Sequence, residues 1–383
     1  MDAPPPRRQR ARRREEPAAR ADAAGRRRAR GRRRAGGRGR AVGALGDPGP
    51  ARAGHGRRRG RRPRRHRRPL ARHDRLPHAD DALALSLGEH PGDACAPEVV
   101  KSNPAFFDAD GMTVAQHFAT SDDGTRVPYF VVGRADLVAG AGDGGTGTGI
   151  GTGTAPTLLY GYGGFEISLT PAYSGALGRA WLSQGGVYVV ANIRGGGEYG
   201  PAWHQAALKA NRHRAYEDFA AVARDLVARG ITTPEHLGME GRSNGGLLAG
   251  NMLTQYPELF GAVIVGVPLL DMRRYTKLLA GASWAAEYGD PDDPEQWEFI
   301  RTFSPYHLFD AEREYPPVLF TTSTKDDRVH PGHARKLAAK MLGEGKDVTY
   351  YENIEGGHGG AANNAQAAHM AAVHYRFLAE RLG

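Results

Sequence analysis

The chain has 383 residues and a formal net charge of +10. Its single cysteine, Cys95, excludes an internal disulfide framework, and no run of about 18 apolar residues indicates a membrane span. The N-terminus lacks the apolar stretch of a secretory signal, so a cytoplasmic location is the default expectation.

The positive charge is confined to the start of the chain. Residues 1–72 contain 27 arginines, no lysine and 5 acidic residues, so they carry +22, whereas the remaining residues carry −12. This segment consists mostly of Arg, Ala, Gly and Pro and has no aromatic residue, so it cannot bury enough apolar surface to offset the entropy of ordering. We therefore expect a disordered, low-complexity segment over residues 1–97 and a folded domain over residues 98–383.

Three interpretations of the arginine-rich segment remain open. It could be a basic arm for nucleic acid, a solvated tail without a role, or the product of out-of-frame translation of GC-rich DNA, since it has arginine without lysine. No aromatic side chains interleave to stack on bases, so we expect no nucleic-acid partner. Residues 73–97 show no pattern from which an element can be assigned.

The first globular elements are predicted to be a hairpin. Residues 112–118 and 126–132 are rich in Val, Thr, Tyr and Phe and predict two strands, and residues 121–124 supply the turn. Residues 139–155 are a glycine- and threonine-rich stretch that predicts a flexible loop.

Strands and helices alternate after this loop. Apolar runs predict strands, and apolar residues at helical spacing predict helices between them. This alternation indicates a mostly parallel sheet with helices on both faces. The expected strands are 157–160, 187–193, 237–240, 262–267, 318–322 and 348–351, and the expected helices are 176–184, 216–229, 334–342 and one from about residue 365.

A Gly-x-Ser-x-Gly motif lies at the centre of this series, from Gly241 to Gly245. It follows the strand 237–240 and precedes apolar residues at helical spacing, which is the context of the nucleophile elbow of the α/β-hydrolase fold. A serine on such a tight turn is strained, and glycines on either side leave room for neighbouring backbone. We therefore predict Ser243 as a nucleophile.

A serine nucleophile needs a base and an orienting acid, which in this fold follow it in the order acid, then histidine. The strand 348–351 leads into a glycine-rich loop that contains His358, and this residue is favoured as base over His330 and His333, whose places fit packing or solvent better. The strand 318–322 leads to Asp326 and Asp327. Because adjacent side chains point to different sides, the residues alone leave both aspartates open.

Two further stretches are rich in glycine and aromatic residues, 160–165 and 192–200. Each follows a predicted strand, and the first lies where the fold places a second oxyanion donor. The alternative is a pair of tight turns with packing aromatics. The second stretch is not followed by Lys-Ser or Lys-Thr, so it does not predict a phosphate loop, and we expect no cofactor and no metal.

Together these motifs resemble the catalytic domain of the prolyl oligopeptidase family of serine peptidases. The resemblance runs from about Thr113 to the C-terminus, roughly 270 residues. It rests on five motifs in the family's order, which begin at residues 160, 192, 241, 326 and 357. It implies Ser243 as nucleophile, Asp326 as the acid, His358 as the base, and the Tyr162 hydroxyl with the Asn244 amide as the oxyanion hole.

The same resemblance implies a pocket for a proline ring. Trp284 would stack on the ring and Arg328 would bind a substrate carbonyl. The apolar wall would be completed by Phe165, Val267, Tyr288 and Val329. The expected activity is hydrolysis of short peptides on the carboxyl side of proline, so peptides are the expected partners. The alternatives are an esterase or acylaminoacyl-type hydrolase with the same triad, or an inactive truncated remnant.

Two features depart from the family's pattern. Arg242 precedes the serine where these enzymes commonly have glycine, and we expect it to alter the entrance of the site. The family's catalytic domain normally sits under a β-propeller, for which residues 1–97 are too short. We therefore expect a truncated or frame-shifted part of a longer peptidase, and no residue pattern indicates an oligomeric state.

Overall fold

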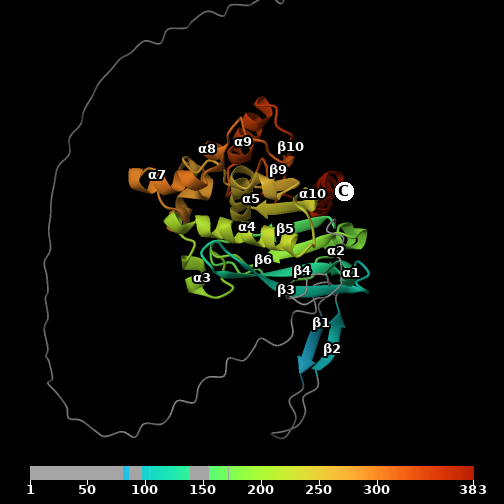
Figure 1. Ribbon diagram of the computed structural model, residues 1–383. Coiled ribbons are helices and arrows are strands. Elements are labelled where there is room, and N and C mark those ends of the chain that lie inside the picture. Colours follow the sequence, from blue (N-terminus) through green and yellow to red (C-terminus); the bar gives the residue numbers. More distant parts are fainter. Residues whose placement is uncertain (1–80, 86–96, 103, 139–154, 171) are drawn as a thin grey trace, which may run out of the picture. The chain divides into compact units, whose positions relative to one another are not determined.

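The computed structural model describes residues 81–85, 97–102, 104–138, 155–170 and 172–383 (Figure 1). The expected disordered segment and the glycine-rich loop 139–155 lie almost entirely outside these ranges. Strand β1 (Asp81–Leu85) pairs antiparallel with β2 (Pro97–Ser102). The sequence analysis assigned no element to the residues of β1.

An eight-stranded sheet organises the remainder of the described chain. The strand order is β10-β9-β8-β7-β5-β6-β4-β3, and the six strands from β10 to β6 are parallel, whereas β4 and β3 continue the sheet antiparallel. The mostly parallel sheet expected from the sequence is therefore confirmed. The strands are β3 (Met112–Thr120), β4 (Arg126–Arg134), β5 (Thr157–Gly161), β6 (Val187–Ala191), β7 (Leu237–Arg242), β8 (Ala262–Gly266), β9 (Val318–Ser323) and β10 (Val348–Asn353).

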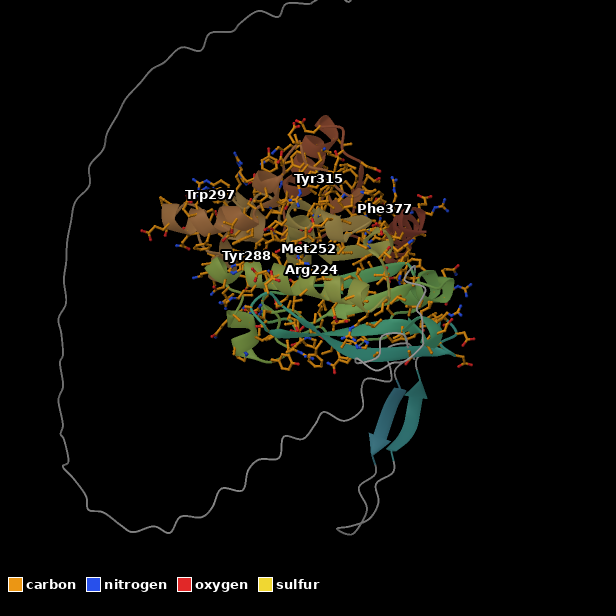
Figure 2. All side chains as sticks on the ribbon, viewed as in Figure 1. Arg224, Met252, Tyr288, Trp297, Tyr315 and Phe377 are labelled. Carbon is orange, nitrogen blue, oxygen red and sulfur yellow. The ribbon has the colours of Figure 1, made fainter. Side chains whose placement is uncertain are left out.

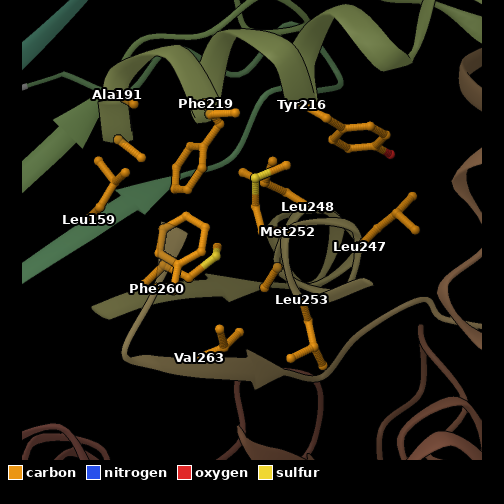
Figure 3. Close-up of a cluster of buried hydrophobic side chains, with 14 of the residues drawn as sticks. Leu159, Ala191, Tyr216, Phe219, Leu247, Leu248, Met252, Leu253, Phe260 and Val263 are labelled. Atoms are coloured by element: carbon orange, nitrogen blue, oxygen red, sulfur yellow. The ribbon is translucent and has the colours of Figure 1, made fainter. Parts of the chain in front are cut away.

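Helices cover both faces of this sheet. Successive residues of a strand point to opposite faces, so Leu159 belongs to one buried cluster and Leu158 to the other. The first cluster includes side chains of α4 and α5 (Figure 3) and also of α9. The second includes side chains of α10, such as Phe377 (Figure 2). The helices are α1 (Ala135–Val138), α2 (Gly175–Ala180), α3 (Pro201–Gln205), α4 (His213–Ala228), α5 (Asn244–Gln255), α6 (Ala285–Tyr288), α7 (Pro294–Ile300), α8 (Pro305–Leu308), α9 (Gly332–Gly343) and α10 (Asn364–Leu382).

Local sequence accounts for most of these elements. The predicted hairpin is formed by β3 and β4, and its turn is closed by the amide of Gly124, which donates to the carbonyl of Ser121 at 2.9 Å.

No helix among the described residues is both long enough and apolar enough to cross a membrane.

The helix predicted over residues 176–184 is wrong as a single element. Helix α2 ends at Ala180, and a short 3-10 turn (Leu182–Gln184) follows Trp181. The indole nitrogen of Trp181 donates to the carbonyl of Val187 at 2.8 Å, which ties this residue to the start of β6. That tertiary hydrogen bond fixes Trp181 where periodicity alone would continue the helix, and the left-handed Gly185 (φ 87°) then ends the 3-10 turn.

Candidate active site

Ser243 lies on a sharp turn between β7 and α5. Its backbone has φ 58° and ψ −117°, a strained conformation for a residue with a side chain. Backbone passes close to the turn on both sides, and the flanking glycines make room for it because they have no Cβ. A Cβ at Gly241 would lie 1.9 Å from the carbonyl oxygen of Gly245, and one at Gly246 would lie 2.6 Å from that of Gly266. The glycines on either side of the serine are therefore sterically required.

The structure brings Ser243, His358 and Asp326 into one hydrogen-bonded chain. The Nε2 of His358 lies 3.0 Å from the Oγ of Ser243, and its Nδ1 lies 2.9 Å from the Oδ2 of Asp326. These three residues follow β7, β10 and β9, so they meet at the carboxyl edge of the parallel strands. This geometry suits a serine whose proton is taken by an imidazole that a carboxylate orients.

Asp326 is the member of the aspartate pair that faces the histidine. Its Oδ1 also accepts hydrogen bonds from the amides of Arg328 and Val329, both at 2.9 Å, and its side chain has no exposed surface. Burial raises the pKa of this carboxyl, but the hydrogen bonds from His358 and the two amides outweigh burial and leave the pKa below its usual value. The carboxylate therefore stays ionised, whereas Asp327 is exposed.

The two other candidate bases have structural roles. His333 is 2 % exposed, and its Nδ1 accepts hydrogen bonds from the amides of Leu270 and Asp271 at 3.2 and 3.0 Å. Burial lowers the pKa of His333 to about 4. The Nδ1 of His330 accepts from the amide of Gly332 at 3.0 Å. Both rings shape the chain around α9.

Both expected oxyanion donors lie beside Ser243. The backbone amide of Asn244 is the first of α5, and Tyr162 lines the same pocket as the serine. Burial raises the pKa of the Tyr162 hydroxyl, so it remains a protonated donor. The side chain of Asn244 serves a different purpose. It donates to the carbonyl of Tyr162 at 2.6 Å and accepts from Arg212 and from the hydroxyl of Tyr288.

A pocket of about 220 Å³ opens in front of the serine. It contains most of the predicted binding residues, together with Ile167 and Leu269, which the sequence analysis did not identify. Val267 and Val329 are only 1 % and 2 % exposed and do not line this pocket. The lining residues are Tyr162, Phe165, Ile167, Ser243, Asn244, Leu269, Trp284, Tyr288, Arg328 and His358.

A buried ion pair supports one wall of the pocket. Arg212 has no exposed surface, and its guanidinium donates to the carboxylate of Glu287 at 2.9 Å and lies 5.3 Å from the ring centre of Tyr288. Glu287 also accepts from the amide of Phe165 at 3.0 Å and lies 2.8 Å from the Nε2 of His204. The pair therefore fixes both aromatic walls. Sequence patterns gave no sign of it, because Arg212 lies in no motif.

Comparisons with known proteins agree with this geometry. The model of the prolyl oligopeptidase family matches residues 174–383. The chain is 52 % identical over 285 residues to an uncharacterized peptidase of Sinorhizobium fredii, covering 74 % of this chain and 38 % of that protein. It is 39 % identical over 245 residues to a prolyl endopeptidase of Elizabethkingia miricola, covering 64 % of this chain and 33 % of that protein.

Solved structures with a similar fold come from the same family of peptidases. A solved structure of a post-proline cleaving enzyme from Rickettsia typhi is similar with a TM-score of 0.69 and 38 % identity, over 75 % of this chain and 40 % of that one. The chain thus spans about two fifths of the length of the relatives it matches. The α/β-hydrolase fold predicted from the elbow is confirmed. This chain belongs to the prolyl oligopeptidase family of serine peptidases.

Proposed function

We propose that this chain hydrolyses peptide bonds on the carboxyl side of proline, through an acyl-enzyme formed on Ser243. The observation that carries the proposal is the presence of the Trp284 indole in the pocket that also contains Ser243 and His358. An indole provides a flat apolar surface on which a proline ring can stack.

The proposed reaction uses the hydrogen-bonded chain in two steps. The Oγ of Ser243 attacks the carbonyl carbon of the scissile bond while the Nε2 of His358 takes its proton. Asp326 holds the imidazole and stabilises its protonated form. The proton then passes to the leaving amine, and a water molecule releases the acyl group by the same route.

Charge on the tetrahedral oxygen is stabilised by fixed donors. We assign this role to the Asn244 amide at the start of α5 and to the Tyr162 hydroxyl. One such donor lowers the barrier by about 3 kcal/mol, because it is already oriented before the charge develops. The hydrogen bond from the Asn244 side chain to the Tyr162 carbonyl ties the backbone of Tyr162 to the start of α5.

The other pocket residues suit a rigid apolar ring. The rings of Phe165 and Tyr288 pack edge to face with their centres 5.7 Å apart. Both line the same pocket as Trp284. A proline ring loses little conformational freedom on entering such a site. The exposed guanidinium of Arg328 is an always-charged donor for a peptide carbonyl. Relatives named as prolyl endopeptidases add support to this specificity.

Proline specificity is tested with two peptide amides that differ only in proline or alanine before the scissile bond. We expect Trp284→Ala to lower kcat/KM for the proline substrate by about tenfold to a hundredfold, because the stacking surface is lost. Labelling of Ser243 by a fluorophosphonate should persist. Trp297→Ala is the matched control, since Trp297 packs against His307 and Arg273 and does not line the pocket.

The outcomes separate the candidate activities. Equal cleavage of the proline and alanine substrates would contradict the proposed proline specificity but would still support peptidase activity. Hydrolysis confined to activated esters would favour the esterase or acylaminoacyl-type alternative. Fluorophosphonate labelling that persists in Ser243→Ala would overturn the assignment of the nucleophile.

A further inference from the structure

Arg242 joins the nucleophile's turn to the loop that carries the histidine. It is the last residue of β7 and directly precedes Ser243. Its Nη2 donates to the carbonyl of Gly359 at 2.9 Å, and Gly359 directly follows His358. One side chain therefore connects the neighbours of both reacting residues. From its place before the serine, Arg242 was expected to alter the entrance of the site. It does not line the substrate pocket, so the structure does not place it at that entrance.

The histidine loop has few internal restraints. Residues 354–361, between β10 and α10, contain four glycines, which have the largest backbone freedom of any residue. Within the loop, the amide of Gly360 donates to the carbonyl of Gly357 at 2.9 Å. From outside, Asn353 donates to the carbonyl of Gly360 at 2.9 Å, and Arg242 to the neighbouring carbonyl. The ring of His358 is also held by Asp326. At the start of the loop, Glu355 makes hydrogen bonds with Asn353 and Gln366. Arg242 is the side chain that binds the carbonyl directly after His358.

The side chain of Arg242 shares a cavity with a carboxylate. A cavity of about 190 Å³ next to the loop is lined by Arg242, Gly359, Glu240 and His374, among others. The carboxylate of Glu240 lies 3.1 Å from the Nδ1 of His374. Burial raises the pKa of Glu240, but His374 and then Arg242 outweigh burial and keep the pKa below its usual value. Arg242 therefore lies on the wall of the same cavity as a carboxylate whose negative charge attracts it.

The loop also packs closely against this group. A Cβ at Gly360 would lie 2.8 Å from the Nη2 of Arg242 and 2.7 Å from the Cε of Met370. The arginine and α10 thus lie in contact with the backbone just after His358.

We propose that Arg242 is a positioning residue that holds the His358 loop against the nucleophile's turn. The proposal rests on the proposed function, because the distance it maintains is the 3.0 Å between His358 Nε2 and Ser243 Oγ. Arg242 contacts neither of these atoms. Its effect passes through the carbonyl of Gly359. It increases the fraction of loop conformations in which the imidazole of His358 can reach Ser243.

The test compares three variants of the full chain. Arg242→Met keeps the apolar stem of the side chain and removes its donors, whereas Arg242→Lys keeps one charged donor. Arg313→Met is the matched control, because Arg313 also donates to backbone carbonyls, those of Thr254 and Gln255 at the far end of α5. All three are compared for kcat, KM, fluorophosphonate labelling rate and thermal unfolding.

We expect Arg242→Met to lower kcat and the labelling rate by about tenfold with KM nearly unchanged, because a slightly misplaced base slows the chemical step. Arg242→Lys should recover most of this loss, and added guanidinium at low millimolar concentration should partly rescue Arg242→Met. Arg313→Met should leave kcat unchanged. Unchanged kcat in Arg242→Met, or an equal loss in Arg313→Met, would overturn the proposal.

Amide hydrogen exchange gives a readout that does not need catalysis. In Arg242→Met, residues 354–361 should exchange several-fold faster while α5 and β7 exchange as before. If the unmodified chain is not labelled by the fluorophosphonate, the proposed function is wrong. Faster exchange confined to this loop in Arg242→Met would still support the restraint on the loop. Exchange unchanged in the loop contradicts the restraint whether or not the chain is active.

Discussion

Asp326 and Asp327 show how much depends on the direction of one side chain. They are neighbours with the same chemistry, yet Asp326 accepts hydrogen bonds from His358 and two backbone amides, and Asp327 is exposed. A carboxylate buried among donors stays ionised and fixes the tautomer of the imidazole. An exposed carboxylate one residue away is screened by water and has no such contact.

This difference predicts unequal effects of the same substitution. Asp326→Asn should lower kcat by about four orders of magnitude, because the amide favours the wrong imidazole tautomer. Asp327→Asn, the matched control, should change kcat by less than about threefold, because an exposed charge is screened. The measurement is turnover of a peptide amide or of an activated ester. The reverse ranking would assign the acid to Asp327.

At the level of elements, the elbow depends on close approach of backbone between β7 and α5. A side chain at Gly241 would collide with the carbonyl of Gly245, and this oxygen belongs to the helix backbone and cannot turn away. The strained conformation of Ser243 is thus maintained by packing on both sides, and the strand–turn–helix unit acts as one rigid piece.

Gly241→Ala should therefore destabilise the chain by about 1–3 kcal/mol and remove most fluorophosphonate labelling, since the collision can be relieved only by moving the turn. Gly343→Ala is the control. Gly343 is the last residue of α9, and a Cβ there would meet nothing within 4 Å. This control should be neutral or stabilise by up to about 1 kcal/mol. Denaturant unfolding measures both, and equal stability of the two variants would contradict the steric explanation.

At the scale of the whole molecule, buried charges connect segments that are distant in the sequence. Arg194, which follows β6, pairs with Asp218 of α4 at 2.7 Å and with Asp123 of the β3–β4 turn. The conspicuous stretch 192–200 therefore contributes a buried ion pair as well as glycine turns. Arg212 and Glu287 make a second such connection beneath the pocket.

Acid stability is also a property of the whole molecule. His333 has a folded-state pKa of about 4 because it is buried, whereas an unfolded histidine titrates near 6.5. Between these values the unfolded chain binds a proton that the folded chain does not. The free energy of unfolding therefore falls as pH is lowered from about 6.5 to about 4, and this loss is complete below about pH 4.

His333→Asn should flatten that part of the profile by up to about 3 kcal/mol. The Asn oxygen can take the place of Nδ1 as acceptor for the amides of Leu270 and Asp271, and it does not titrate. His369→Asn, at an exposed histidine, is the matched control. The measurement is denaturant unfolding at several pH values, and a slope unaltered by His333→Asn would contradict the buried neutral state.

The sequence by itself determined the eight strands from β3 to β10, the longer helices α4, α5, α9 and α10, the mostly parallel sheet, the elbow at Ser243 and the loop of His358. These features depend on local patterns, such as apolar runs, helical spacing and glycines at tight turns, which are visible in a few neighbouring residues. The resemblance to a family then singled out Asp326 and the aromatic pocket, which the residues alone left open.

Only the tertiary structure decided which side chains meet. Arg212 reaches Glu287 across 75 residues and Arg242 reaches Gly359 across 117, and no periodicity in the sequence relates such positions. The break in the helix at Trp181 has the same origin, because a hydrogen bond to Val187 overrides the local pattern. Side-chain direction in a loop is determined by the backbone packed around it, and that packing exists only once the sheet has formed.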